Sequence, residues 1–229
     1  MATFWTYAMI KAKVEQDLAL EDEVFVEPAE LLGYVNEAIR EAEAEVHGLY
    51  EDYFLNRATL TLVQGQEEYD LPADIYAHKI RRVVYKNGSE VYKLERMRDW
   101  KKFENYAIES INQSSTRYYY FIINPTAGSP KLLLSPPAKT AGPYVTIWYL
   151  RDANQLVADT DICDIPEFVS FVLQYTKTRC YEKEGHPNLA KAMQDLEQQR
   201  RQMTGTLASM VPDGDNEIEA DFSSYEEMT

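Results

Sequence analysis

The chain has 229 residues, and its 45% hydrophobic content is enough to bury the core of one large domain or two small ones. Its formal net charge is −15, from 38 acidic and 23 basic side chains, which disfavours non-specific attraction of the whole molecule to a polyphosphate backbone. Cys163 and Cys180 are too few and too poorly spaced for a disulfide framework or a zinc site. Because no apolar run approaches the roughly 20 residues of a membrane span and the first residues lack a signal-peptide pattern, we expect a cytoplasmic protein without a membrane segment.

Two helices are expected before residue 57. The first follows a predicted N-cap at Thr3, and one of its sides carries Phe4, Ala8, Ala12, Glu15 and Leu18. The second begins near Pro28, a residue that suits the first turn of a helix. Its apolar residues recur in steps of three and four, which predicts a long helix with one buried side: Leu32, Val35, Ile39, Ala42, Val46, Leu49 and Tyr53.

From Arg57 to about Arg151 the pattern changes to that of β-strands. The strand-like runs are bounded by Pro and Gly and read RATLTLV, KIRRVVYKNGSEVYKLE, YYYFII, KLLLSP and YVTIWYL. Asn87-Gly88 predicts a two-residue hairpin turn. Pro72, in YDLPADI, cannot donate a ladder hydrogen bond, so a strand is expected to end there. We expect a small antiparallel sheet or sandwich inserted between helices.

Helices are expected again after DICDIPEF. Asp164 is a candidate N-cap, and the predicted buried side of the first of these helices holds Phe168, Phe171, Val172 and Tyr175. Gly185 and Pro187 separate it from a last helix whose apolar positions are Leu189, Met193, Leu196, Met203, Leu207 and Met210. The predicted fold class is therefore α+β, predominantly a helical bundle of two N-terminal and two C-terminal helices. The predicted organisation is a helical domain of residues 1–56 and 162–210, a β-rich antiparallel insertion of residues 57–161, and an acidic C-terminal arm of residues 211–229.

The arm reads VPDGDNEIEADFSSYEEMT and contains seven acidic residues but no Lys or Arg. It is too charged to bury a core of its own. Four spaced apolar residues, Ile218, Phe222, Tyr225 and Met228, nevertheless interrupt the charge. Two interpretations stay open: a segment that orders on a partner, and a solvated end of the chain.

No catalytic, cofactor-binding or metal-binding residue is predicted. Asp70 and Asp74 are better explained by turn formation than by a catalytic carboxylate pair. The stretch DTDICD departs from a calcium loop at three required positions, and His47, His78 and His186 are scattered without a metal-site pattern. There is no P-loop, G-x-G-x-x-G or G-x-S-x-G motif. A peptidoglycan hydrolase-like enzyme with acidic catalysis is kept as an alternative.

Basic residues gather between residues 79 and 102, with Tyr85, Tyr92 and Trp100 among them: Lys79, Arg81, Arg82, Lys86, Lys93, Arg96, Arg98, Lys101 and Lys102. Such a patch is typical of a nucleic-acid-binding module. A solvated hairpin face with its own acids is favoured over it, given the negative charge of the whole chain. A third possibility is that the acidic tail of a neighbouring copy lies against this patch.

The order of these segments resembles the head-to-tail adaptor (connector) proteins of short-tailed bacteriophages, the group that includes the tail accessory factor below the portal. The resemblance covers nearly the whole chain. It rests on LLGYVNEAIREAEAE, YDLPADI, VVYKNGSEVYKLE, YYYFIINP, LLLSPP, VTIWYLRDANQL and DICDIPEFVSFVLQYTKTRCYEKEG. Each motif is a structural device that other folds also use, so the resemblance lies in their order.

The resemblance implies a structural virion protein without catalysis or cofactor, forming a ring of twelve copies between the portal and a downstream tail or nozzle protein. DNA would pass through an axial channel without being specifically bound. The portal-contacting residues would be Leu207, Met210, Ile218, Phe222, Tyr225 and Met228. The sheet with the hairpin would contact neighbouring subunits or the tail through Lys86, Asn87, Gly88, Arg96 and Arg98. The location implied is the head-tail junction of the virion, and the host cytoplasm during assembly.

Overall fold

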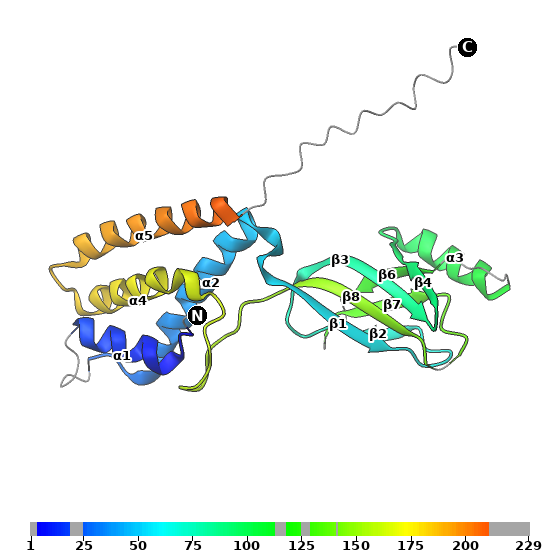
Figure 1. Ribbon diagram of the computed structural model, residues 1–229, viewed down its shortest axis with the longest axis horizontal. Coiled ribbons are helices and arrows are strands. Elements are labelled where there is room, and N and C mark those ends of the chain that lie inside the picture. The colour runs from blue at the N-terminus through cyan, green and yellow to red at the C-terminus, as the bar shows by residue number, and fades with distance from the viewer. Residues whose placement is uncertain (1–3, 19–24, 113–117, 125–128, 141, 211–229) are drawn as a thin grey trace, which may run out of the picture.

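A computed structural model describes residues 4–18, 25–112, 118–124, 129–140 and 142–210 of the chain. Helices come first, strands follow, and helices return at the end, as the sequence pattern predicted (Figure 1). The helices are α1 (Tyr7–Leu18), α2 (Pro28–Leu49), α3 (Trp100–Asn112), α4 (Val169–Glu184) and α5 (Leu189–Met210), with short 3-10 helices η2 (Glu51–Phe54) and η3 (Pro166–Phe168). The strands are β1 (Leu55–Thr61), β2 (Glu68–Asp70), β3 (Ile75–Asn87), β4 (Glu90–Lys93), β5 (Glu95–Arg96), β6 (Tyr119–Ile123), β7 (Lys131–Ser135) and β8 (Tyr144–Arg151).

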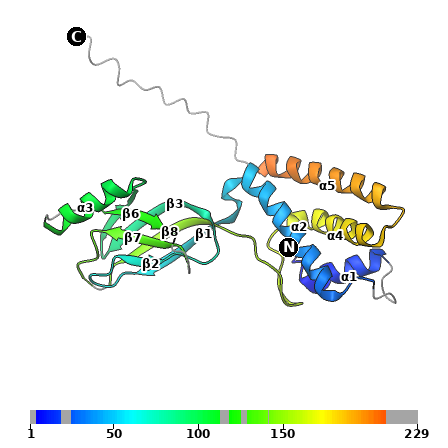
Figure 2. The ribbon, with the colours of Figure 1, turned by 180° about the vertical axis from the view of Figure 1, so that it is seen from behind.

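The molecule is elongated, with α1, α2, α4 and α5 at one end and the strands with α3 at the other (Figures 1 and 2). The largest core of the helical end combines side chains of α2, α4 and α5 with the segment that follows β8. Val35 and Ile39 of α2, Phe171 of α4 and Leu207 of α5 are all almost fully buried there. A smaller cluster of Val14, Leu31 and Cys180 joins α1 to α2 and α4.

The long helix α2 forms where the apolar stripe predicted it. Glu27 and Glu30 form a reciprocal capping box at its start, which satisfies backbone N–H groups that no earlier turn can reach. The predicted buried side is wrong at the C-terminal end of α2, because Leu49 is 41% exposed. Glu43 and His47 are buried in its place, since the last turns of α2 face the strands and the chain after β8.

The predicted side of the first helix was wrong. Helix α1 begins at Tyr7, and its buried residues are Tyr7, Ile10 and Val14, whereas Phe4 is 67% exposed. The residues before Tyr7 are held by the distant chain, because Thr6 bridges Ile162 and the Trp5 carbonyl accepts a hydrogen bond from the Cys163 amide at 2.8 Å. This pairing delays the helix and changes which side of it is buried.

The strands form two four-stranded sheets, in the orders β1-β8-β3-β4 and β2-β7-β6-β5. All pairings are antiparallel except the short parallel pairing of β5 with β6. One core lies between the two sheets, with Val83 and Ile147 from the first and Leu132 and Tyr120 from the second. The α+β class is confirmed, but a predominantly helical protein is not, because the β content is substantial.

Both predicted turns are present, one of them shifted by a residue. The YDLPADI segment ends β2 and turns into β3, with the Ile75 amide donating to the Pro72 carbonyl at 3.3 Å. In the hairpin, Asn87 still pairs with Glu90, so the two loop residues are Gly88 and Ser89 rather than Asn87 and Gly88. Gly88 has φ 57°, the positive value that the first residue of a type II′ turn requires.

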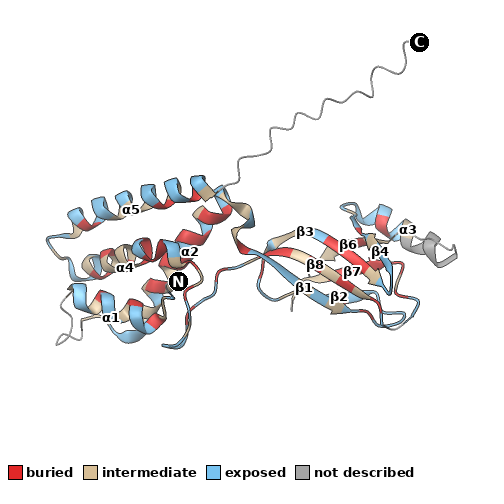
Figure 3. Cartoon of the chain, viewed as in Figure 1, coloured by how far each residue is buried: buried red, intermediate tan, exposed pale blue. Residues whose placement is uncertain are grey.

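Helix α3 was not predicted. Asp99 caps it, since its Oδ1 accepts a hydrogen bond from the Lys101 amide at 3.0 Å. Trp100 and Phe103 pack their rings 5.4 and 5.7 Å from the ring of Phe121 on β6. Helix α3 therefore covers the face of the second sheet that points away from the shared core. Among the elements that the structure describes, no helix covers the corresponding outer face of the first sheet (Figures 1 and 3).

Candidate functional site

The two carboxylates around Pro72 have structural contacts. Asp74 Oδ1 accepts a hydrogen bond from the Tyr149 hydroxyl at 2.9 Å, and the Asp74 carbonyl accepts one from the Asp152 amide at 2.7 Å. Asp70 lies 4.0 Å from the Lys131 ammonium group on the neighbouring strand. The Asp74 contacts connect the turn to the end of β8, and the Asp70 contact joins β2 to β7, so both carboxylates have structural partners.

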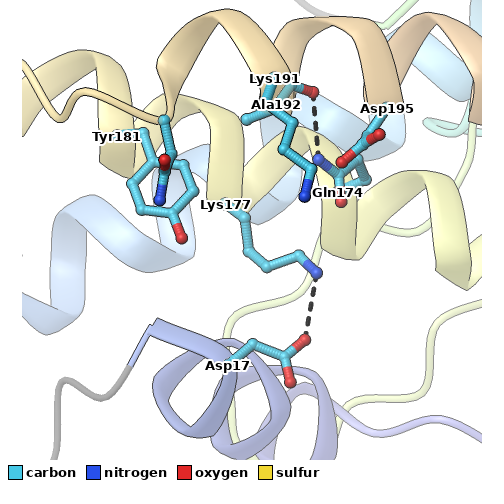
Figure 4. A pocket seen from close by; sticks show the side chains of 8 residues that line it. Asp17, Gln174, Lys177, Tyr181, Lys191, Ala192 and Asp195 are labelled. Carbon is cyan, nitrogen blue, oxygen red and sulfur yellow. Dashed lines mark hydrogen bonds and ion pairs between the residues drawn. The ribbon is translucent and has the colours of Figure 1, made fainter.

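A polar cavity of about 290 Å³ lies between α1, α4 and α5 (Figure 4). Lys177 Nζ donates to Asp17 Oδ2 at 3.1 Å, and Gln174 Nε2 donates to the Ala192 carbonyl at 3.1 Å. Hydrogen bonds from Lys13 and then Lys177 lower the pKa of Asp17, partly offset by its burial, so this carboxylate is ionised and unsuited to act as a general acid. The side chains that line the cavity connect α4 to α1 and to α5, so the cavity lies where these three helices pack against one another.

Buried ionisable groups hold α2 against the strands. Glu43 Oε1 accepts a hydrogen bond from the Ala153 amide at 2.6 Å, and burial raises the pKa of Glu43. The ring of His47 stacks on Tyr76 of β3 with centroids 3.7 Å apart. Burial, and then the charge of Lys79, lowers the pKa of His47, while Glu51 opposes this shift. These groups connect the helical end to the sheets.

We expect His47→Phe to reduce the loss of stability on acidification. The lowered pKa means that the folded state binds fewer protons than the unfolded state below the ordinary value of 6.5, so stability falls as the pH decreases through that range. Glu43 acts in the opposite direction, because its raised pKa favours folding as the pH falls towards 4.5. Urea unfolding of both proteins at pH 7.5 and 5.5 measures the difference; an equal loss in the two proteins would contradict it.

Asp164 is not the predicted N-cap. Helix α4 follows η3, and neither has a side-chain cap. Asp164 Oδ2 instead accepts hydrogen bonds from Arg151 Nη1 at 2.5 Å and from the Asn154 amide at 3.0 Å. The Asp164 carboxylate therefore binds Arg151, the last residue of β8, and the segment that follows this strand. Because these groups occupy the carboxylate, Asp164 does not cap α4 as predicted.

Among the residues that the structure describes, the three histidines included, no group of three or more His, Cys, Asp or Glu side chains is arranged to hold a metal ion. Cys163 and Cys180 are free and buried, and burial raises the pKa of each thiol to about 11. Both thiols belong to the hydrophobic packing of the helical end.

The basic residues of 79–102 do not form one surface. Lys79 and Arg81 are ion-paired with Glu51, and Arg81 also contacts Asp52. Arg96 belongs to the second sheet, and Lys101 and Lys102 lie at the start of α3.

The residues expected to contact neighbouring subunits or the tail are also divided between two places. Lys86, Asn87 and Gly88 lie on or at the tip of the β3–β4 hairpin, while Arg96 and Arg98 lie in and after β5. The tyrosines between them, Tyr85 and Tyr92, pack towards the shared core.

Three of these basic residues, Arg82, Lys86 and Lys93, share the outer face of the first sheet with Arg57. In the strand register, Trp148 lies between Arg57 and Arg82, and Tyr144 is opposite Lys86. These residues alternate with Val83, Tyr85, Val145 and Ile147, which point into the core, so they share the opposite face. Lys93 of β4, opposite Val84, completes the set. We call this surface the cationic sheet face: Arg57, Arg82, Lys86, Lys93, Tyr144 and Trp148.

Each aromatic ring of the cationic sheet face lies beside a cation. The Arg82 guanidinium carbon is 5.9 Å from the Trp148 ring centroid, and Lys86 Nζ is 5.8 Å from that of Tyr144. Near η2 the face has a depression of about 470 Å³ lined by Asp52, Leu55, Arg81, Arg82 and Trp148. This surface was not predicted from the sequence; the signal for it was the alternation of polar and apolar residues in β8 together with the strand order.

The predicted portal-contacting residues fall into two groups. Leu207 is fully buried in the helical core, and Met210 is partly buried against it. The side chain of Leu207 therefore meets no partner while α5 is packed as observed. The other four, Ile218, Phe222, Tyr225 and Met228, lie outside the described residues.

Comparison with known proteins identifies the family. The SU10 adaptor protein family matches residues 5–217, whereas no curated protein matches the chain. Within the described residues, no helix has the length and apolar character needed to cross a membrane. The match agrees with the resemblance to phage head-to-tail adaptors and implies a structural virion component that interacts with portal and tail proteins. Because the family match covers nearly the whole length of the chain, the chain belongs to the SU10 adaptor protein family.

Proposed function

We propose that the protein is a head-to-tail adaptor that forms a ring between the portal and the tail and leaves an axial channel for DNA. The family match over residues 5–217 carries this proposal. Three of the described carboxylates, those of Asp74, Glu43 and Asp164, accept hydrogen bonds that hold neighbouring segments together, which is compatible with a structural role. The proposed ring has twelve copies, following the resemblance of the whole chain to such adaptors.

The charge distribution supports contacts between different surfaces of neighbouring copies. Residues 55–151 contain 14 Lys and Arg against 9 Asp and Glu, whereas residues 1–54 and 152–210 contain 9 against 22. A closed ring requires such heterologous contacts, in which one surface of a copy meets another surface of the next. Opposite charges at the two ends of the protomer favour this arrangement over a self-complementary dimer.

The two parts of the chain have separate proposed roles. We treat residues 1–56 and 162–210 as a helical domain and residues 57–161 as a β-rich insertion, supported by their separate hydrophobic cores. The acidic arm, residues 211–229, contacts the portal through Ile218, Phe222, Tyr225 and Met228. Leu207 and Met210 contribute by fixing the last turns of α5 to the core, from which the arm departs.

The hairpin end of the protomer is proposed to contact neighbours or the tail protein. Lys86, Asn87 and Gly88 lie at the β3–β4 hairpin, and Arg96 and Arg98 are exposed in the chain that follows. Their positive charge suits the acidic helical end of an adjacent copy. The net charge of −15 also suits a channel through which DNA slides, because a strongly cationic lumen retains phosphates.

Mass measurement tests the proposal. The protein alone is expected to run as a monomer of 26.5 kDa in dilute solution, and a mixture with its portal is expected to contain one ring of adaptor copies per portal. Light scattering coupled to size-exclusion chromatography gives both masses. A stable dimer without portal, or no mass increase with portal, would contradict the proposal.

A further inference from the structure

We propose that, in the free protein, the acidic arm of residues 211–229 lies on the cationic sheet face of its own chain. Transfer of the arm to the portal would then uncover this face for the acidic helical end of a neighbouring copy. This second step rests on the proposed function, whereas the contact itself is a property of the isolated protein. It would explain why ring formation waits for the portal.

The cationic sheet face is left without acidic partners by the described part of the chain. Arg57, Arg82, Lys86 and Lys93 form no ion pair with any described residue. Most Lys and Arg residues of the described helical end are ion-paired, for example Arg179 with Glu37 at 2.6 Å and Arg200 with Glu41 at 3.3 Å. Four like charges on one sheet face repel each other, so an anionic segment placed on them is stabilised.

The face also offers apolar contact area. Trp148 and Tyr144 are partly exposed between the cations, and Val91, opposite Lys86 on β4, is 57% exposed. The second sheet has α3 on its corresponding face, with Trp100 and Phe103 against Phe121. The first sheet has no such cover among the described elements. An occupant that is acidic and carries a few aromatic or aliphatic side chains fits this combination.

Residues 211–229 have that composition. Their seven carboxylates are not balanced by any Lys or Arg, and Ile218, Phe222, Tyr225 and Met228 supply spaced apolar side chains. Carboxylates match the guanidinium and ammonium groups of the face, and Phe222 and Tyr225 match Trp148 and Tyr144. Charge complementarity therefore selects the arm over any basic or neutral segment.

The arm begins within reach of the face. Helix α5 ends at Met210, which packs on the same core cluster as Tyr50 and Tyr53. Tyr50 directly precedes η2, and Tyr53 lies within it. Figures 1 and 2 both show the end of α5 beside the end of α2, where the chain passes into β1. The 19 residues after Met210 span up to about 60 Å when extended, against about 23 Å for the seven residues of β1.

Other occupants are less favoured. A covalently attached arm has a millimolar effective concentration at a site it can reach, which exceeds the concentration of a second copy in dilute solution. DNA would bring phosphates to the same cations, but the remaining net charge of the chain repels it. Both are distinguishable from the arm by experiment.

Zero-length carbodiimide cross-linking of the full-length protein tests the contact directly. The reagent joins a Lys amine to an Asp or Glu carboxylate as an amide when the two touch. At 50 mM salt we expect cross-links from Lys86 or Lys93 to carboxylates of residues 211–229, found by mass spectrometry in the monomer band. Raising the salt to 500 mM is expected to reduce them about fivefold or more, because the pairs are at the surface.

A charge-reversal variant gives an independent readout. Arg82→Glu with Lys86→Glu is expected to accelerate chymotrypsin cleavage after Phe222 and Tyr225 by about fivefold to tenfold, since two ion-pairing cations become repulsive. Lys101→Glu with Lys102→Glu is the matched control, with the same change in net charge on exposed residues of α3. It is expected to leave the cleavage rate unchanged. Melting curves of both variants report whether the fold is retained.

Three outcomes overturn the proposal. Equal cleavage rates in the two variants would show that the arm is not held by the cationic sheet face. Cross-links found only between copies would assign the face to a second molecule. Tight binding of a short DNA duplex to the wild-type protein, lost in the Arg82/Lys86 variant and accompanied by no arm cross-links, would assign the face to phosphates. Since no portal is present in these experiments, failure here leaves the adaptor function to its own test.

Discussion

Deletion of residues 211–229 is expected to abolish attachment to the portal and leave the rest of the protein folded. The hydrophobic clusters of both ends are built from residues within 4–210, so the deletion removes none of their members. Loss of a segment with four apolar anchors is expected to weaken portal binding by about a hundredfold or more, because a few apolar side chains usually carry most of an interface's free energy. Co-sedimentation with purified portal measures the attachment, and circular dichroism checks the fold.

Point variants in the full-length chain separate the anchors from the length of the arm. Phe222→Ala with Tyr225→Ala is expected to reproduce most of the loss of portal binding, whereas Ser223→Ala with Ser224→Ala is expected to retain it. Both pairs keep all seven carboxylates of the arm. Attachment that survives the deletion would show that another surface binds the portal and that the assignment of the arm is wrong.

Leu207→Ala is expected to lower the free energy of unfolding by roughly 2–5 kcal/mol, the usual range for a buried leucine. Leu207 is 0% exposed in the core shared by α2, α4 and α5, so the truncation leaves a cavity beneath the last turns of α5. Urea unfolding measures the loss. Met193→Ala on the same helix is the control, because Met193 is 53% exposed and its truncation is expected to cost less than about 0.5 kcal/mol.

This pair of variants also separates two roles for Leu207. If the residue acts through packing, its truncation weakens portal attachment only as far as it destabilises the fold. An unfolding free energy equal to that of the wild type, combined with weaker attachment, would instead assign Leu207 to direct contact with the portal and contradict the observed packing.

Local sequence patterns correctly predicted the helices and strands that bury one side against the rest of the protein. Helix α2 and strand β8 are examples, because an apolar residue every three to four positions, or every second position, is set by the geometry of the element itself. The buried side of the first helix was predicted wrongly because Thr6 and Trp5 pair with Ile162 and Cys163, which are far away in the sequence. Asp164 failed for a related reason, since Arg151 competes for its carboxylate.

The candidate surface was harder to predict than the elements. Lys86 and Tyr85 are adjacent in the sequence but point to opposite faces of the sheet, so a basic stretch with aromatic residues did not define one patch. The cationic sheet face combines four strands, and its composition follows from the order β1-β8-β3-β4. That order places Arg57 and Arg82 on either side of Trp148, although 25 positions separate the two arginines.

We propose that this chain works by offering surfaces to its own copies and to neighbouring components of a phage particle. Electron microscopy of the protein mixed with its portal would show these contacts. We expect a closed ring of copies on one end of the portal, with an open axial channel and with the arms extending along the portal. Copies scattered without a ring, or portals that remain bare at saturating protein, would contradict it.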